Sequence, residues 1–326
     1  MSSITIPNFL EVVQSDIQRV EDWLQEQLRF EHEELEPLLA QLRGFQGKRL
    51  RSAQVFLIAR SLGKVSPWHT SLAGILEMIH CATLIHDDVL DGATMRRGRS
   101  CLHQDFAWKE AILMGDWVYA RALSCSTHFE DLQCSRVLAD ATARVCRGEI
   151  RQNLSSGNFD LSEPSYLEMV DGKTSALFEA GGRLAAHYSQ ANSVQLEAAA
   201  RHGFLVGRAF QLADDLLDVS GEETTMGKTL GTDWERKKMT LPTLRLRDSL
   251  GKEDLSQLRA TFGSSRQLQD LCAGSLEQAY EDACESTRKE LQQQLQEATS
   301  ELEVFPSGEA KDSLVSLTMH CGNRHK

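Results

Sequence analysis

Segments of helical length follow one another along almost the entire chain, and apolar–polar alternation of the strand type is essentially absent. Only 6 of the 326 residues are proline, so few positions would interrupt a helix. No stretch rich in glycine, serine or proline divides the chain. We therefore predict an all-α protein that forms one domain over residues 1–326. The predicted helices cover residues 9–42, 50–62, 70–90, 109–123, 137–153, 166–187, 196–219 and 275–303.

Two of these predicted helices differ in how their apolar residues are distributed. Residues 70–90 have few polar positions on any face, which indicates a helix at the centre of a large bundle. Residues 275–303 carry one apolar stripe on a charged background, which indicates a surface helix. That stripe is too short and too mixed to predict a coiled coil.

Composition and charge exclude several classes of protein. The formal net charge of −12 argues against nucleic-acid binding, which depends on basic surfaces. The uncharged stretches are too short to cross a bilayer, so we expect no transmembrane segment. The first residues lack the basic and apolar regions of a signal peptide. The 8 cysteines include no CxxC pair, which favours reduced thiols in a cytoplasmic protein.

The pattern Asp-Asp-x-x-Asp occurs twice, each time near the end of an apolar predicted helix. The first motif comprises Asp87, Asp88 and Asp91, and the second comprises Asp214, Asp215 and Asp218. Residues four apart lie on one face of a helix, so the outer aspartates of each motif project together. Carboxylates this close repel one another unless a cation lies between them. Mg²⁺, which prefers oxygen ligands and is commonly shared with substrate phosphates, is the expected cation.

Basic residues accompany both motifs, as a phosphate-bearing substrate would require. They are Lys48, Arg49 and Arg51 in GKRLR, Arg96 and Arg97 after the first motif, Lys173 beside Thr174, and Lys228, Lys237 and Lys238 after the second motif. Arginine binds phosphate oxygens in a bidentate manner, whereas lysine supplies a mobile point charge. The combination predicts a metal-assisted site for a phosphate-bearing substrate.

These motifs resemble those of the trans-polyprenyl diphosphate synthases, a family of prenyltransferases. The resemblance runs in the family's order through GKRLR, EMIHCATLIHDDVLDGATMRRG, MGDWVYARA, GEIRQN, KTSALF, GRAFQLADDLLDVSG and GKTLGTDWERKKMTLP, and the tail SGEAKDSLVSLTMHCGNR is similar to the family's C-terminal helix. It implies a single large helical bundle of the isoprenoid synthase type around a central cavity, usually as a homodimer. It also implies that the chain condenses isopentenyl diphosphate with an allylic diphosphate to an all-trans polyprenyl diphosphate.

The resemblance assigns roles to individual residues. The six aspartates would bind two or three Mg²⁺ ions that hold the allylic diphosphate. The same diphosphate would be contacted by Arg96, Lys173, Thr174, Gln211, Lys228 and Lys238. The diphosphate of isopentenyl diphosphate would be contacted by Lys48, Arg51, His80 and Arg97. The residues expected to be catalytic are Asp87, Asp88, Asp91, Arg96, Lys173, Asp214 and Lys238.

Product length depends on the residues one turn before the first motif. Thr83 and Ala82 lie four and five residues before Asp87 and are small, whereas short-chain members of the family carry an aromatic residue there. Since each helical turn adds about 5.4 Å, roughly one isoprene unit, we predict a product of six or more units. The residues that could end the growing tail deeper down are Met78, Ile79, Trp117, Tyr119 and Leu138. The alternative is that a neighbouring helix closes the cavity early, which would give a geranylgeranyl-length product.

Two other functions remain as alternatives. A class I terpene cyclase has the related fold, but it carries a different second metal motif and lacks an isopentenyl site such as GKRLR. A non-catalytic partner subunit of a prenyl synthase would not need all six aspartates, and all six are present. The chain departs from the family's usual sequence in the loop over residues 92–95, in Ser175 after Lys173–Thr174, and in Lys237, where many members have glycine.

Overall fold

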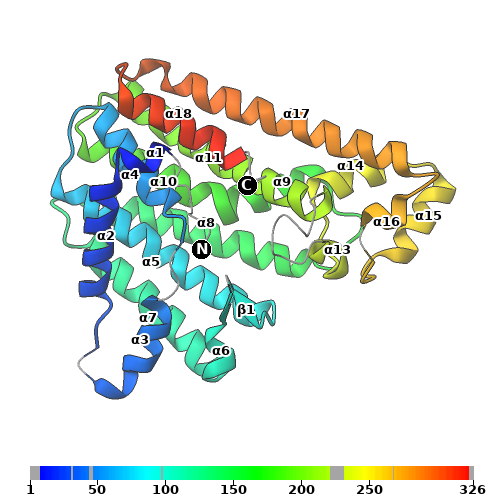
Figure 1. The fold of residues 1–326 in the computed structure, drawn as a ribbon, viewed down its shortest axis with the longest axis horizontal. Coiled ribbons are helices and arrows are strands. Elements are labelled where there is room, and N and C mark those ends of the chain that lie inside the picture. The colour runs from blue at the N-terminus through cyan, green and yellow to red at the C-terminus, as the bar shows by residue number, and fades with distance from the viewer. Residues whose placement is uncertain are drawn as a thin grey trace. The chain divides into compact units, whose positions relative to one another are not determined.

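The computed structural model describes residues 8–30, 32–43, 47–96, 98–220, 231–266 and 268–322. These residues are helical almost throughout, which confirms the predicted all-α class (Figure 1). The strands found among them are β1 (Met95–Arg96) and β2 (Arg99–Ser100), which form one short antiparallel pair. In this part of the chain, no helix is long and apolar enough to cross a membrane.

The chain divides into two compact units. Unit 1 comprises Met1–Asp140, Ala180–Ala199 and Val304–Leu314, and unit 2 comprises Ala141–Glu179, Ala200–Glu303 and Val315–Lys326. Unit 1 contains α1 (Asn8–Glu11), α2 (Gln14–Gln27), η1 (Glu33–Leu35), α3 (Glu36–Arg43), α4 (Leu50–Ser61), α5 (Pro67–Leu90), both strands, α6 (Leu102–Asp105) and α7 (Trp108–Ser126). Unit 2 contains α9 (Glu163–Val170), η2 (Asp171–Ser175), α13 (Thr232–Glu235), α14 (Leu241–Ser249), α15 (Lys252–Thr261), α16 (Leu268–Cys272) and α17 (Glu277–Glu301). Residues of both units belong to α8 (Gln133–Ser155), α10 (Ala176–Tyr188), α11 (Ser193–Ser220), η3 (Leu302–Val304) and α18 (Glu309–Gly322).

Helix α5 is the buried helix of unit 1 that the sequence predicts. It begins with Pro67, whose missing N–H is not needed in the first turn of a helix. Every residue from 72 to 79 is buried, and α5 packs against α2, α4 and α7. A Cβ atom on Gly74 would lie 2.2 Å from Cε3 of Trp23, so this glycine lets the indole ring of α2 rest directly on α5. This packing fixes the helix that ends in the first aspartate motif.

The prediction of one continuous helix over residues 9–42 is wrong. The structure has α1, α2, η1 and α3 in this region. Leu28 leaves the helical conformation with a ψ of 68°, and Pro37 lies in the first turn of α3. A proline tolerated at that position would clash inside a helix that ran on from α2. The apolar pattern alone did not reveal this break.

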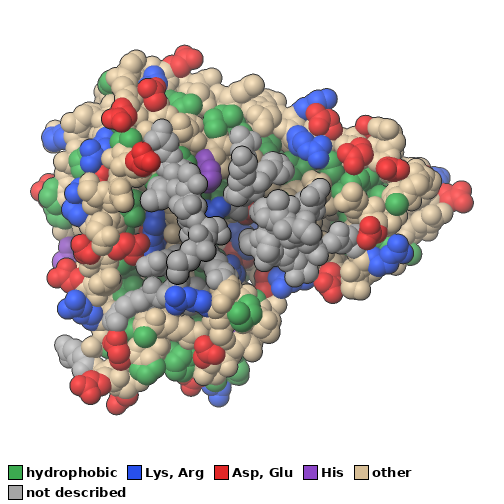
Figure 2. Space-filling model, viewed as in Figure 1, with side chains coloured by type: hydrophobic (Ala, Val, Ile, Leu, Met, Phe, Trp, Pro, Cys, Tyr) green, Lys and Arg blue, Asp and Glu red, His purple; other side chains and the backbone are tan. Residues whose placement is uncertain are grey.

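The core of unit 2 is built around Trp234. Its side chain is buried, its Nε1 donates to the carbonyl oxygen of Thr261 at 3.0 Å, and its ring packs against Phe159 and Phe262. Helix α17 packs along α14 (Figure 1) and buries one stripe of side chains that includes Tyr280. The predicted surface helix over residues 275–303 is therefore confirmed, with bounds of Glu277–Glu301. On the face drawn in Figure 2, acidic and basic side chains of the described residues are intermixed, as is typical of a water-exposed surface.

Other helices differ from the prediction. The sequence pattern does not predict α14, α15 and α16, which are short, whereas α18 confirms the expected C-terminal helix. The helix predicted over residues 166–187 is interrupted by η2, a π-helical turn that contains Lys173 and Thr174. Such turns insert an extra residue into a helix and are frequent at functional sites. All eight cysteines are free thiols.

Gly207 provides a test of this packing. A Cβ atom at this position of α11 would lie 2.6 Å from Cα of Ser175 in η2, which is backbone and cannot rotate away. We expect Gly207→Ala to lower the free energy of unfolding by about 1–3 kcal/mol, measured by urea denaturation. The matched control is Gly251→Ala, because a Cβ atom there meets no atom within 4 Å. Equal stability losses in the two variants would contradict the close approach of α11 and η2.

Candidate active site

The first aspartate motif forms the end of α5 in unit 1. The backbone N–H of Asp91 donates to the carbonyl oxygen of Asp87 at 2.8 Å and closes the last turn. Asp91 is exposed and Asp87 half-buried, whereas Asp88 is only 2% exposed. The outer aspartates of this motif therefore lie toward solvent, and the middle one faces the protein.

Arg96 holds the buried aspartate of this motif. Its Nε donates to Oδ1 of Asp88 at 2.6 Å, in an ion pair that links β1 to α5. The residue predicted to contact the allylic diphosphate thus has a carboxylate partner in unit 1. Two other predicted diphosphate contacts, Arg97 and Lys228, lie outside the described residues.

Arg49 has a structural role that the sequence did not reveal. It precedes α4 with a left-handed backbone (φ 51°), and its guanidinium donates to both carboxylate oxygens of Glu21 at 2.5 and 3.0 Å and to Glu77 of α5 at 3.0 Å. Burial alone would lower the pKa of Arg49, but the charge of Glu77 and the bonds to Glu21 outweigh it and raise that pKa. Arg49 is thus engaged with two carboxylates, which agrees with its absence from the diphosphate contacts predicted for GKRLR, Lys48 and Arg51.

The same network joins the segments that carry three residues predicted for the isopentenyl site. Glu77 is 6% exposed and accepts further hydrogen bonds from the backbone N–H and the hydroxyl of Ser52. The segment that carries Lys48 and Arg51 is thereby joined to α5, on which His80 follows Glu77 by three residues. No sequence pattern could have paired residues so far apart along the chain.

In unit 2 the second motif lies near the end of α11, and its middle residue is again buried. Asp215 is 3% exposed; the hydroxyl of Tyr166 donates to its Oδ2, and Nε2 of Gln211 donates to its Oδ1 at 2.9 Å. Burial raises the pKa of Asp215 above its usual range, the two hydrogen bonds oppose this rise, and the charges of its neighbouring aspartates add to it.

The last residue of the second motif anchors α13. Oδ1 of Asp218 accepts hydrogen bonds from the backbone N–H and the hydroxyl of Thr232, and Oδ2 accepts one from the N–H of Asp233 at 3.1 Å. A carboxylate at a helix start satisfies N–H groups that have no partner within the helix. Each carboxylate oxygen has two lone pairs, so these bonds leave room for a metal ion.

The π-helical turn η2 places Lys173 and Thr174 beside α11. The ammonium of Lys173 lies 2.9 Å from Oε1 of Gln152 and 2.7 Å from Oε1 of Glu149. The hydroxyl of Thr174 donates to Oε1 of Gln211 at 2.9 Å. Three predicted diphosphate contacts of unit 2 are thus brought together.

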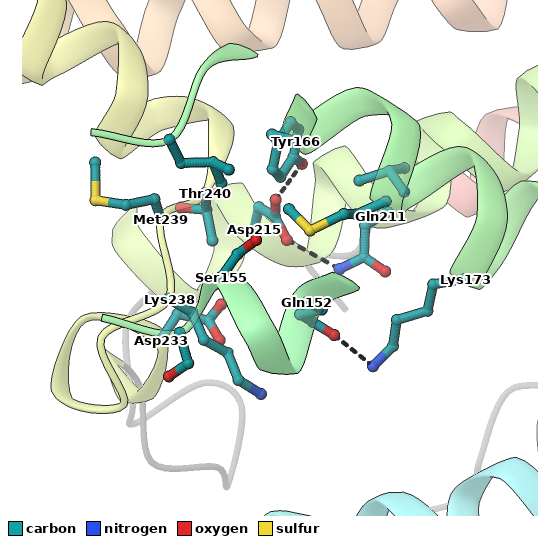
Figure 3. Close-up of a pocket in the computed structure, with 14 residues that line it drawn as sticks. Gln152, Ser155, Tyr166, Lys173, Gln211, Asp215, Asp233, Lys238, Met239 and Thr240 are labelled. Carbon is teal, nitrogen blue, oxygen red and sulfur yellow. Dashed lines mark hydrogen bonds between the residues drawn. The ribbon is translucent and has the colours of Figure 1, made fainter. Parts of the chain in front are cut away.

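Gln152, Lys173 and Gln211 line a pocket of about 60 Å³ (Figure 3). Its polar wall includes Gln152, Lys173, Gln211, Asp215, Asp233 and Lys238, and its apolar wall includes Leu161, Met169, Val170 and Met239. Asp233 was not among the predicted site residues, although it stands in the GTDW segment that carried the resemblance. Burial, followed by the charges of Asp218 and Asp215, raises the pKa of Asp233 well above its usual range.

Comparison with known proteins identifies the family of this chain. A model of the polyprenyl synthetase family matches residues 32–283. The chain belongs to this family. It is 34% identical over 289 residues to the octaprenyl diphosphate synthase of Haemophilus influenzae, covering 86% of this chain and 87% of that protein.

Solved structures of polyprenyl synthases confirm the predicted fold. The chain is similar to a decaprenyl diphosphate synthase from Rhodobacter capsulatus, with a TM-score of 0.88, 29% identity and coverage of 98% and 99%. It is also similar to a polyprenyl synthase from Caulobacter crescentus complexed with calcium and isoprenyl diphosphate, with a TM-score of 0.88, 28% identity and full coverage of both chains.

One departure from the family's usual sequence has a structural explanation. Lys237, which stands where many members have glycine, adopts a left-handed backbone with φ 55°. Glycine reaches this conformation without steric cost, and other residues do not. The Lys237 side chain lies against Gly263, where a Cβ atom would approach it to 2.4 Å.

The donor set of both motifs fits a hard divalent cation, because it consists of carboxylate oxygens. Within the described ranges, however, no three Asp, Glu, His or Cys side chains form a ready-made metal site. An Mg²⁺ ion would therefore need additional oxygen ligands from water or from a diphosphate, which is how proteins commonly bind Mg²⁺.

The Arg49 network predicts a large effect on stability. We expect Arg49→Ala to lower the free energy of unfolding by about 3–5 kcal/mol, because Glu77 would stay buried without its counter-charge. Combining it with Glu77→Gln should recover part of the loss in a double-mutant cycle of urea denaturation.

The control is Arg259→Ala, which breaks an exposed pair with Asp160 and should cost less than about 1 kcal/mol. Similar costs for the two arginines would show that the Arg49–Glu77 pair is not effectively buried.

Proposed function

We propose that the chain is an Mg²⁺-dependent prenyltransferase that condenses isopentenyl diphosphate with an allylic diphosphate to a long-chain all-trans polyprenyl diphosphate. The observation that carries this proposal is the presence of both intact aspartate motifs in a member of the polyprenyl synthetase family. The similar octaprenyl and decaprenyl diphosphate synthases support the long-chain product. The proposed enzyme is one domain over residues 1–326 and works as a homodimer in the cytoplasm.

The two aspartate motifs are proposed to bind the metal ions that hold the allylic diphosphate. The aspartates of both motifs, with Asp87, Asp91 and Asp214 foremost, would hold two or three Mg²⁺ ions. The chemistry that Mg²⁺ would supply there is neutralisation of the charge that develops on the departing diphosphate. Lys173 and Lys238 line the pocket of unit 2 and would hold the same diphosphate by charge, together with Arg96.

The residues of GKRLR and α5 would bind the second substrate. Lys48, Arg51, His80 and Arg97 are proposed to hold the diphosphate of isopentenyl diphosphate, so that its double bond can attack the allylic carbocation. The apolar wall of the pocket would keep water away from that cation, which water would otherwise convert to an alcohol. The departed diphosphate would then accept the proton that is lost.

Metal-motif variants test this function. Asp87→Ala and Asp214→Ala should each lower turnover by about three orders of magnitude or more, because each removes an Mg²⁺ ligand. Without Mg²⁺, their melting temperatures should equal or exceed that of the parent, since like-charge repulsion is relieved. The assay uses purified protein, Mg²⁺, allylic diphosphates of several lengths and labelled isopentenyl diphosphate.

Asp160→Ala is the matched control, because this aspartate pairs with Arg259 on the surface of unit 2. It should keep the activity of the parent. Absence of elongation by the parent with every allylic primer would overturn the enzyme proposal and favour the partner-subunit alternative. More than about a tenth of the activity in both motif variants would overturn the metal assignment.

The surroundings of Ala82 support a long product. Ala82 is buried on α5, and the hydroxyl of Thr83 donates to the carbonyl oxygen of His80 at 2.8 Å, within its own helix. Neither residue offers the large side chain that would end a tail early. Among the residues considered as a deeper floor, Ile79 and Met78 are buried, and Trp117 packs against Phe30 with ring centroids 4.2 Å apart.

Ala82→Phe should therefore shorten the product from six or more isoprene units to about three or four, while the first condensation continues. The reason is that an aromatic ring one turn before Asp87 would occupy the path of the tail. Chromatography of the dephosphorylated products measures the length. A parent product of four units, or an unchanged length in the variant, would show that the tail does not pass Ala82.

A further inference from the structure

We propose that Tyr166 is a positioning residue of the diphosphate site. Its hydroxyl fixes the Asp215 carboxylate, and this carboxylate in turn orients the side-chain amide of Gln211 through a hydrogen bond. Asp215 would then serve this role in place of the direct Mg²⁺ ligand that its motif predicts. This inference rests on the proposed function and deepens it, because it separates the aspartates that bind the metal from one that orients the contacts of the substrate.

The first observation is that protein donors occupy both oxygens of Asp215. Tyr166 reaches it from α9 and Gln211 reaches it from one turn earlier on α11, and Figure 3 shows the two donors on different sides of the carboxylate. Asp215 and Tyr166 are 3% and 4% exposed. The oxygens of Asp218 also accept hydrogen bonds, but Asp218 is only half-buried, whereas Asp215 and its tyrosine donor are both buried. A buried carboxylate held from two sides has little freedom to turn toward an ion.

The second observation is that the hydrogen bonds continue to the π-helical turn. Nε2 of Gln211 donates to Asp215, and Oε1 of Gln211 accepts from the hydroxyl of Thr174 at 2.9 Å. The carboxylate can only accept, so it determines which end of the Gln211 amide faces it. The second N–H of that amide is then left for a ligand of the pocket that Gln211 lines.

The surrounding contacts make this connection rigid. On one side of Gln211, Arg208 of α11 donates to both oxygens of Asp171 at 2.9 and 2.7 Å. Gly207 brings the backbone of α11 against Ser175. Helix α11 is thus fastened to η2 at three successive points, and Tyr166 secures the point nearest the metal motif.

Tyr166→Phe tests the proposal because it removes one hydroxyl and keeps the ring. We expect kcat/KM for the allylic diphosphate to fall about tenfold, while KM for isopentenyl diphosphate and the Mg²⁺ concentration at half-maximal rate stay within twofold. A readout without catalysis is calorimetric binding of inorganic diphosphate in the presence of Mg²⁺, which should weaken about tenfold.

The matched control is Tyr280→Phe. Tyr280 is equally buried in unit 2, at 3% exposure, and its hydroxyl donates to the carbonyl oxygen of Val219 at 2.8 Å. This variant loses a buried hydroxyl of the same kind and should keep the diphosphate affinity of the parent. If both tyrosine variants lower the affinity equally, the effect is general destabilisation and the proposal is overturned.

Asparagine variants separate the positioning role from the ligand role. Asp215→Asn can still accept a hydrogen bond from Tyr166, so it should keep at least about one hundredth of the activity with an unchanged Mg²⁺ requirement, whereas Asp214→Asn should lose far more. A tenfold higher Mg²⁺ requirement in Asp215→Asn would overturn the inference. An inactive parent that nevertheless binds diphosphate in a Tyr166-dependent manner would overturn the proposed function and leave the positioning role supported.

Discussion

The site of unit 2 depends on keeping several carboxylates close together in a partly water-excluded place. Burial and mutual repulsion both act against the ionised forms of Asp215 and Asp233, which explains why the pKa of each is raised. The structure offsets this with donors: Tyr166 and Gln211 for Asp215, and the start of α13 for Asp218. The helices around the pocket serve largely to position these donors.

Unit 1 also contains buried carboxylates, but it stabilises them with positive charges. Here arginines compensate buried acids: Arg96 pairs with Asp88, and Arg49 pairs with Glu77. A basic residue in a motif that is expected to bind phosphate, such as Arg49 in GKRLR, therefore need not contact the phosphate itself. Arg49 lies between two predicted contacts, Lys48 and Arg51, and its bonds fix the backbone that presents them.

Much of the fold and of the site could be predicted from the sequence. Helical periodicity predicted the buried helix α5, and the aspartate spacing predicted both motifs. What escaped prediction depends on contacts between distant residues or on backbone detail. Tyr166 donates to an aspartate 49 positions away, and no local pattern marks such a pair. The π-helical turn at Lys173 differs from an α-helix by a single inserted residue, which periodicity does not resolve.

The two motifs share a division of roles that follows from helix geometry. In an Asp-Asp-x-x-Asp sequence the outer residues lie on one face, and the middle residue is rotated about 100° from the first. The middle aspartate therefore lies to one side of the motif face, and in both motifs that side is packed against the protein. Asp88 and Asp215 are accordingly the buried members, at 2% and 3% exposure, and each is held by a donor from another element. Each middle aspartate thus has its own partner from another element. Arginine offsets the negative charge of Asp88 with a positive one, whereas tyrosine stabilises Asp215 by a hydrogen bond alone.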